Sequence, residues 1–318
     1  MKRGVLIFLA LLLITSLVLF TGCENKTDKV RRLSNYIGGS DGLAIGFTKN
    51  APPDSVLDER QEDFDLSLDL ENKGEYTIMP GEILATLSGI DREAFNLPSL
   101  NAKNAFQLER KINDRGVVRD GGRNDLPFGL ATYTEDLAAD FTTDIVADIC
   151  YKYRTVAVAA TCLKRNTLQL KTTDACLIDN DKVEFENSGA PIQVTNVETR
   201  KAGRNSVKIT FLIENKGSGE VYLPGTFTDS CFGHEKDEAR AHVTMDSPSP
   251  RINFRCDLFN SASQGDVKLY DKKRQVSCII DTGSLQETAY EALVNIQIDY
   301  IYRNAIFKEI TIENTNVL

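Results

Sequence analysis

The sequence predicts an all-β protein: two tandem Ig-like antiparallel β-sandwiches behind an N-terminal signal or anchor segment. Three observations lead to this fold class. Short runs alternate apolar and polar residues, Asn-Lys-Gly turns follow two of these runs, and the same order of features occurs twice within 318 residues. Alternation with a period of two is typical of a strand with one buried face. Hydrophobic residues make up 42% of the chain and charged residues 26%, which indicates a folded globular protein rather than a disordered one.

The first repeated feature is an alternating strand that ends in a tight turn. LSLDLENKGEYTIMPG occupies residues 66–81, and ITFLIENKGSGEVYLPG occupies residues 209–225. Each stretch predicts a half-buried strand, an Asn-Lys-Gly turn and a second strand that ends in Pro-Gly, because Asn and Gly accept the positive φ of a tight turn. We therefore expect Leu66 and Leu68 to be equivalent to Ile209 and Phe211, and all four to be buried.

The second repeated feature is a strand that carries Tyr-x-Tyr. IVADICYKYRT at residues 145–155 matches VNIQIDYIYRN at residues 294–304 with an offset of 149, as from Tyr151 to Tyr300. A short turn is expected after each Tyr-x-Tyr, at 154–155 and 303–304, followed by one more strand. Two separate features that recur in the same order indicate a duplicated domain rather than a short solenoid repeat.

The duplication sets the expected domain organisation. The expected segments are a signal peptide or membrane anchor (1–22), a tether (23–39), a first Ig-like β-sandwich (40–164), a polar linker (165–188) and a second Ig-like β-sandwich (189–314). The two copies differ in their loops, which are residues 88–100 and 113–129 in the first and 231–250 in the second. Long loops on a rigid sandwich are where binding sites usually lie.

The first 23 residues predict export from the cytoplasm. Lys2 and Arg3 precede an apolar stretch without charge that continues to Gly22, the pattern of a secretory signal. Phe20-Thr21-Gly22-Cys23 is similar to a bacterial-type lipobox, with Phe20 in place of the usual Leu, and predicts lipidation of Cys23. The alternative is an uncleaved helix, since residues 4–22 are long enough to span a bilayer. Both interpretations place residues 24–318 outside the cytoplasm, tethered to the cell membrane.

The six remaining cysteines predict disulfides, because an even number of Cys in an exported chain indicates oxidised pairs. Cys256 and Cys278 flank two strand-like runs and are paired first. Cys176 closes onto either Cys150 or Cys162. If all six are oxidised within one chain, at least one bridge joins the two copies, and we expect it to end at Cys231.

No catalytic, cofactor-binding or metal-binding constellation is predicted. The Asp281-Thr282-Gly283 motif occurs once, whereas an aspartic protease needs two carboxylates, so we interpret it as a turn. Cys231, His234 and His242 would supply only three zinc ligands, and Cys231 is expected to be oxidised. The formal net charge of −9 disfavours binding to nucleic-acid phosphates.

The ENKG turn after an alternating strand, together with the closing Tyr-x-Tyr strand, resembles the CARDB-type Ig-like modules of archaeal cell-surface and S-layer-associated proteins. LAIGFTKNAPP (43–53), ICYKYRTVAVAATC (149–162) and GAPIQVTNVE (189–198) are similar to membrane-anchored archaeal surface proteins with two such modules. The resemblance implies a surface-exposed sandwich. It adds no substrate and no catalytic residue.

The leading interpretation is a non-enzymatic cell-surface binding or structural protein of the envelope or of adhesion. Its expected partners are the membrane, through the N-terminus, and an envelope protein or glycan. The alternative is an extracytoplasmic enzyme whose site uses carboxylates in the sandwich loops, such as Asp120, Asp125 and Glu135. That alternative predicts a concave pocket in which these acids converge.

Overall fold

The computed structural model describes residues 34–169, 174–178, 182–232, 234–249, 251–286 and 288–315. These residues form mostly antiparallel β-sheets, with one parallel strand pair, and two short 3-10 turns, η1 (Glu235–Asp237) and η2 (Asp257–Phe259), which confirms the all-β fold class. The signal segment and Cys23 lie outside the described residues. Within the described part of the chain, no helix is long and apolar enough to cross a membrane.

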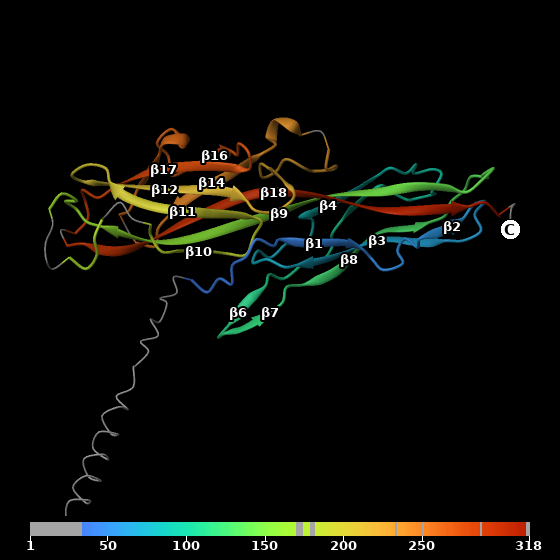
Figure 1. Ribbon diagram of the computed structural model, residues 1–318, viewed down its shortest axis with the longest axis horizontal. Coiled ribbons are helices and arrows are strands. Elements are labelled where there is room, and N and C mark those ends of the chain that lie inside the picture. Colours follow the sequence, from blue (N-terminus) through green and yellow to red (C-terminus); the bar gives the residue numbers. More distant parts are fainter. Residues whose placement is uncertain are drawn as a thin grey trace, which may run out of the picture. The chain divides into compact units, whose positions relative to one another are not determined.

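The strands form four sheets (Figure 1). The nine-stranded sheet contains β2 (Ser55–Leu57), β4 (Ile83–Ser88), β5 (Asn101–Lys103), β9 (Phe141–Leu163), β10 (Phe185–Asn187), β13 (Glu220–Tyr222), β14 (Arg240–Asp246), β16 (Gln264–Lys268) and β18 (Tyr290–Glu313). A three-stranded sheet contains β1 (Leu43–Phe47), β3 (Phe64–Asn72) and β8 (Arg123–Ala131). A four-stranded sheet contains β11 (Ile192–Lys201), β12 (Ser206–Asn215), β15 (Phe254–Cys256) and β17 (Lys273–Asp281), and a small hairpin contains β6 (Ile112–Asp114) and β7 (Val117–Arg119).

The long strands β9 and β18 run antiparallel, side by side, from the pair Phe141–Ile312 to the pair Leu163–Tyr290 (Figure 1). The turns expected at 154–155 and 303–304 therefore do not exist, because both positions lie inside these strands. The reason is visible in the side-chain pattern. Tyr153, Thr155 and Ala157 are all buried, so the alternation passes through the expected turn without a change of face.

The two repeats consequently share one sheet, whereas we expected each repeat to close its own sandwich. β9 belongs to the first repeat and β18 to the second, and each strand continues from its own half of the molecule into the other half. The strand pairing sets Tyr151 against Tyr302 and Tyr153 against Tyr300. The offset of 149 relates Tyr151 to Tyr300 and Tyr153 to Tyr302, so it exchanges the two facing pairs. An approximate twofold axis therefore passes between the facing residues Lys152 and Ile301.

The two smaller sheets pack their buried faces into the same core. β3 lies between β1 and β8, and β12 occupies the equivalent place between β11 and β17. Leu66, Leu68, Ile209 and Phe211 are fully buried, as the sequence predicts, in one cluster with Ile149 and other residues of the long strands. Burial of apolar side chains on this scale is the main stabilising contribution to a fold.

Four tyrosines surround the approximate twofold axis: Tyr151, Tyr153, Tyr300 and Tyr302. Their rings pack edge to face, with centroids 5.7 Å apart for Tyr151 and Tyr153 and 6.2 Å apart for Tyr300 and Tyr302. Burial raises the pKa of the Tyr151 and Tyr300 hydroxyls well above the ordinary value, so both hydroxyls stay neutral. These rings form the centre of the core.

Three disulfides use all six cysteines of the described residues. Cys256 and Cys278 face each other on β15 and β17. Cys176, which the sequence allows to pair with either of two partners, pairs with Cys162. Cys150 and Cys231 are 81 positions apart, and this bridge links the two repeats. It lies in a small buried cluster with Leu84, Tyr222 and Ile301.

Two segments expected to be a tether and a linker take part in the fold. The end of the predicted linker forms β10, which pairs with Ala157–Ala159 of β9. The end of the predicted tether is held by Glu75, whose carboxylate accepts hydrogen bonds from the backbone N–H groups of Ile37 and Gly38, each 3.0 Å long. Backbone hydrogen bonds thus fix both segments against the core.

Candidate binding surface

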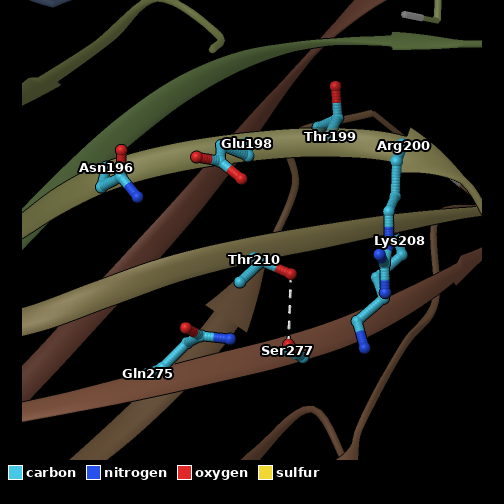
Figure 2. Close-up of a pocket in the computed structure, with 8 residues that line it drawn as sticks. All are labelled: Asn196, Glu198, Thr199, Arg200, Lys208, Thr210, Gln275 and Ser277. Carbon is cyan, nitrogen blue, oxygen red and sulfur yellow. Dashed lines mark hydrogen bonds between the residues drawn. The ribbon is translucent and has the colours of Figure 1, made fainter. Parts of the chain in front are cut away.

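A concave polar surface of about 300 Å³ lies on the four-stranded sheet (Figure 2). We call it the polar hollow. It is lined by Asn196, Glu198, Thr199, Arg200, Lys208, Thr210, Gln275 and Ser277. The side chains come from three neighbouring strands, β11, β12 and β17, so their spacing is set by a hydrogen-bonded sheet rather than by a loop.

A β-bulge in β11 shapes the polar hollow. The register between β11 and β12 shifts between Thr195 and Glu198, and Asn196 adopts a positive φ of 52°. Val194 and Val197 are both buried although they are three positions apart, which shows that one extra residue has been inserted. Such a bulge changes the direction of the side chains beside it. Asn196 and Glu198 are therefore exposed in the polar hollow.

The floor of the polar hollow consists of residues on β12 and β17 that alternate with core residues. Thr210 lies directly opposite Ser277, and their hydroxyl oxygens are 3.1 Å apart (Figure 2). Val276 and Cys278, the neighbours of Ser277, are fully buried. The polar face of this sheet is thus held in place by the packing of its other face.

The polar hollow combines two cations with one carboxylate. Arg200 and Lys208 carry positive charge, and Glu198 is the one acid among the lining residues. The Lys208 ammonium lies 3.8 Å from the carboxylate of Asp257, a distance that leaves it able to turn toward a ligand. The Ser277 hydroxyl bonds to another hydroxyl rather than to a base, so the arrangement that activates a serine nucleophile is missing from this surface.

The carboxylates of the enzyme hypothesis lie elsewhere. Asp120 is exposed after β7, and Asp125 is exposed on β8, where it accepts a 3.2 Å hydrogen bond from the Thr48 hydroxyl. Glu135 is exposed in the segment that follows β8. None of the three lines the polar hollow. Within the described ranges, no group of three or more His, Cys, Asp and Glu residues is placed to hold a metal ion.

The remaining motifs of the sequence have structural roles. The Asp281 carboxylate accepts a 2.9 Å hydrogen bond from the backbone N–H of Gly283, so the Asp-Thr-Gly motif forms the expected turn. The Nδ1 atom of His242 lies 2.7 Å from an Asp266 oxygen, and the ring of His234 packs against Phe227. Together with the Cys150–Cys231 disulfide, these contacts give the three suspected zinc ligands separate partners.

The sequence did not point to the polar hollow, because we expected binding residues in the divergent loops. The loop at 113–129 instead forms most of the hairpin β6–β7 and much of β8. One signal in the sequence was informative. The apolar residues Val194 and Val197 break the alternation of β11, and such a break predicts a bulge and a change of side-chain direction.

Comparisons with known proteins add little. No family model matches the chain, and no curated protein matches it. Among solved structures, it is similar to a serine-rich repeat adhesion glycoprotein of Streptococcus agalactiae, with 12% identity over 90% of this chain and 100% of that chain. The TM-score is 0.16, so this similarity carries no argument about fold or function.

Proposed function

We propose that the chain is a non-enzymatic cell-surface binding protein, anchored to the membrane by its N-terminus, that holds an acidic saccharide of the cell envelope in the polar hollow. One observation carries the proposal. A hydrogen-bonded sheet presents a concave surface whose charged, amide and hydroxyl groups, except for the buried Thr199, are exposed or partly exposed. Groups of this kind form hydrogen bonds with sugar hydroxyls and ion pairs with a sugar carboxylate.

The chemistry of the lining residues supports this ligand class. Arg200 and Lys208 supply donors for a carboxylate, and a planar guanidinium binds a carboxylate through two parallel hydrogen bonds. Glu198, Asn196 and Gln275 supply acceptors and donors for hydroxyls. Because strand pairing fixes the backbone of these residues, only their side chains have to be ordered when a ligand binds.

The three disulfides support an extracytoplasmic location, since structural disulfides persist in oxidising compartments. The proposed anchor is a lipid on Cys23, preceded by the basic and apolar signal segment. Replacement of Cys23 by Ser should leave an uncleaved precursor that does not incorporate a labelled lipid. Unchanged mass and processing of the variant would instead favour the uncleaved spanning helix.

Calorimetric titration of the full chain with a hexuronic-acid oligosaccharide tests the ligand class, and its carboxyl-reduced counterpart is the control ligand. We expect binding of the acidic form only. Arg200→Ala and Lys208→Ala should each weaken it about tenfold, because each removes a hydrogen bond between charged groups. Lys201→Ala is the matched control, since Lys201 is exposed on β11 but does not line the polar hollow. Equal binding of both ligands, or no effect of either variant, would contradict the proposal.

A further inference from the structure

The nine-stranded sheet has an uncovered edge along residues 304–310 of β18, which we call the open edge. On one side, these residues pair with β9. On the other side, β13 pairs with residues 301–303 and β2 pairs with residues 311–313. No strand of the described part of the chain pairs with the seven residues between them.

The backbone groups of every second residue of the open edge point away from β9. The N–H of Thr311 donates to the Asp54 carbonyl and the carbonyl of Glu313 accepts from Asp58, so these residues direct their backbone groups away from β9. Since the direction repeats every second residue, Ala305, Phe307 and Glu309 direct theirs the same way. An edge with several unpaired N–H and C=O groups is a template for another strand.

The equivalent edge, which belongs to β9 in the other half of the molecule, is occupied. The offset of 149 takes residues 305, 307 and 309 to Val156, Val158 and Ala160 on β9. There, β10 pairs with residues 157–159, the N–H of Ala160 donates to the Glu184 carbonyl at 2.9 Å, and the N–H of Ser188 donates to the Val156 carbonyl at 2.8 Å. The same edge geometry therefore accepts an extended segment within this molecule.

The first repeat uses its own matching segment for another contact. Residues 35–39 correspond to residues 184–188 at the same offset, but they do not pair with β18. Glu75 binds the N–H groups of Ile37 and Gly38, and the carbonyl of Gly39 accepts a hydrogen bond from Ala190 of the second repeat. This diversion leaves the open edge without the strand that its counterpart has.

We infer that the open edge binds a short extended segment of a partner protein, which adds to the sheet as a strand antiparallel to β18. This site is separate from the polar hollow and does not depend on it. Two copies of the chain cannot pair through their open edges. In an antiparallel pair of these edges, β13 of one copy would occupy the same place as β2 of the other copy, and the two strands would collide. A terminal tail or an extended loop, which leaves the sheet after about five residues, fits the gap.

The side chains of the open edge indicate the chemistry of the partner segment. Phe307 is 73% exposed on the outer face, so a β-branched or aromatic residue opposite it gains a cross-strand contact. Ile306 faces inward against the core and suits an apolar neighbour. Lys308 also faces inward, and its ammonium contacts the Pro52 carbonyl at 2.7 Å and Asp54 at 3.1 Å. This inward-facing cation disfavours a basic or bulky apolar residue opposite it, whereas an acidic residue there can share the ammonium with Asp54.

A synthetic peptide with the central sequence Lys-Asp-Ile-Val-Thr tests the inference. In antiparallel register, its residues lie opposite Glu309, Lys308, Phe307, Ile306 and Ala305 in that order. Backbone amide exchange of the full chain is measured by NMR with and without the peptide. We expect the exchange of residues 305, 307 and 309 to slow about tenfold, while residues 306 and 308, which face β9, stay unchanged. The control peptide carries Pro in place of Ile and should have no effect, because Pro lacks the central donor.

Variants of the protein complete the test. Phe307→Ala keeps every backbone donor and should weaken peptide binding several-fold, through loss of the side-chain contact alone. Phe307→Pro removes an outward donor and should abolish binding; where this variant does not fold, the Pro peptide supplies the same comparison. If the amides of residues 305, 307 and 309 exchange as slowly as those of residues 306 and 308 in the free protein, they already have hydrogen-bond partners and the inference is overturned. Equal effects of the two peptides, or no effect of the Ile peptide at millimolar concentration, would overturn it as well.

Discussion

Asn72 and Asn215 perform the same task in the two repeats. Each side-chain oxygen accepts a hydrogen bond from a buried tyrosine hydroxyl, Tyr153 or Tyr302, with a distance of 3.0 Å in both cases. Each also accepts the backbone N–H two residues later, at 3.2 Å in the first repeat and 3.1 Å in the second. The turn that follows the alternating strand is thereby bonded to the centre of the shared sheet.

This equivalence predicts matched effects of two substitutions. Tyr153→Phe and Tyr302→Phe each remove a buried hydroxyl that donates to an Asn side chain and accepts a backbone N–H, from Tyr76 in the first repeat and from Gly219 in the second. Each should lower the free energy of unfolding by about 1–3 kcal/mol, because a backbone donor loses its acceptor together with the hydroxyl. Urea denaturation at neutral pH measures both effects. Tyr270→Phe is the control, because Tyr270 is exposed and should change little. Effects that differ greatly between the two core variants would contradict the equivalence.

Asp58 connects the end of β18 to the segment after β8. Its carboxylate accepts hydrogen bonds from the N–H of Leu137 at 3.0 Å and from the N–H and hydroxyl of Thr315 at 3.0 and 2.7 Å. The hydrogen bond from Leu137, followed by those from Thr315, holds the pKa of Asp58 below its usual value. A depressed folded-state pKa contributes stability above the unfolded-state pKa of about 3.9, and that stability is lost as the pH falls through the folded-state value.

Asp58→Asn should therefore destabilise the protein in a pH-dependent manner. At pH 7, the variant lacks one charged acceptor oxygen and should unfold at a lower urea concentration than the unmodified protein. As the pH falls below the unfolded-state pKa of about 3.9 and then through the lower folded-state value, the carboxyl becomes protonated first in the unfolded and then in the folded protein, so the difference between the two proteins should shrink. Urea midpoints measured from pH 7 to pH 3 check this. A difference that stays constant over this range would show that Asp58 does not supply the effect through its charge.

At the scale of elements, the two Asn-Lys-Gly turns require glycine for space. A Cβ atom on Gly74 would overlap the Tyr153 hydroxyl and lie 2.5 Å from the Asp41 carbonyl oxygen. A Cβ atom on Gly217 would overlap the Tyr302 hydroxyl and lie 3.0 Å from Pro191. Both turns press directly against the central tyrosines, so the turn and the long strands must move together.

Gly74→Ala and Gly217→Ala should each destabilise the protein by about 1–3 kcal/mol, the usual cost of an overpacked core. Gly46→Ala is the matched control, since Gly46 lies in β1 and a Cβ atom there meets no atom within 4 Å. Its effect should stay within about 0.5 kcal/mol. Thermal unfolding of the three variants provides the comparison. Tolerance of Ala at position 74 would mean that the turn does not contact Tyr153.

The elements show which parts of the fold the sequence could predict. The alternation around Leu66 and Ile209 specifies strands and their buried faces, because side-chain direction is a local property. Whether β9 turns at Arg154 or continues depends on tertiary contacts. No Gly or Pro forces a turn there, and the residue that pairs with Arg154, Asp299, lies 145 positions away in the sequence. The polar hollow was missed for the same reason: Asn196, Lys208 and Gln275 meet only through strand pairing.

For the molecule as a whole, the structure resembles two halves that have exchanged strands. The first part of β9 lies in its own repeat, and its last residues pair with β18 and with β10 in the other half. Such an exchange is the arrangement found in domain-swapped dimers, here within a single chain. It makes the polar hollow and the open edge parts of one compact unit, so we expect that neither repeat folds without the other.

Cleavage of the chain between the repeats tests this arrangement most directly. A protease site is inserted after Ile178 in the variant Cys150→Ser/Cys231→Ser, so that no disulfide spans the cut. The uncut variant serves as the control. After cleavage, size-exclusion chromatography without denaturant should show both fragments eluting together at the position of the uncut chain, because β9 pairs with β18 along its 23 residues. Elution of two separate folded fragments, each of about half the mass, would contradict the shared sheet.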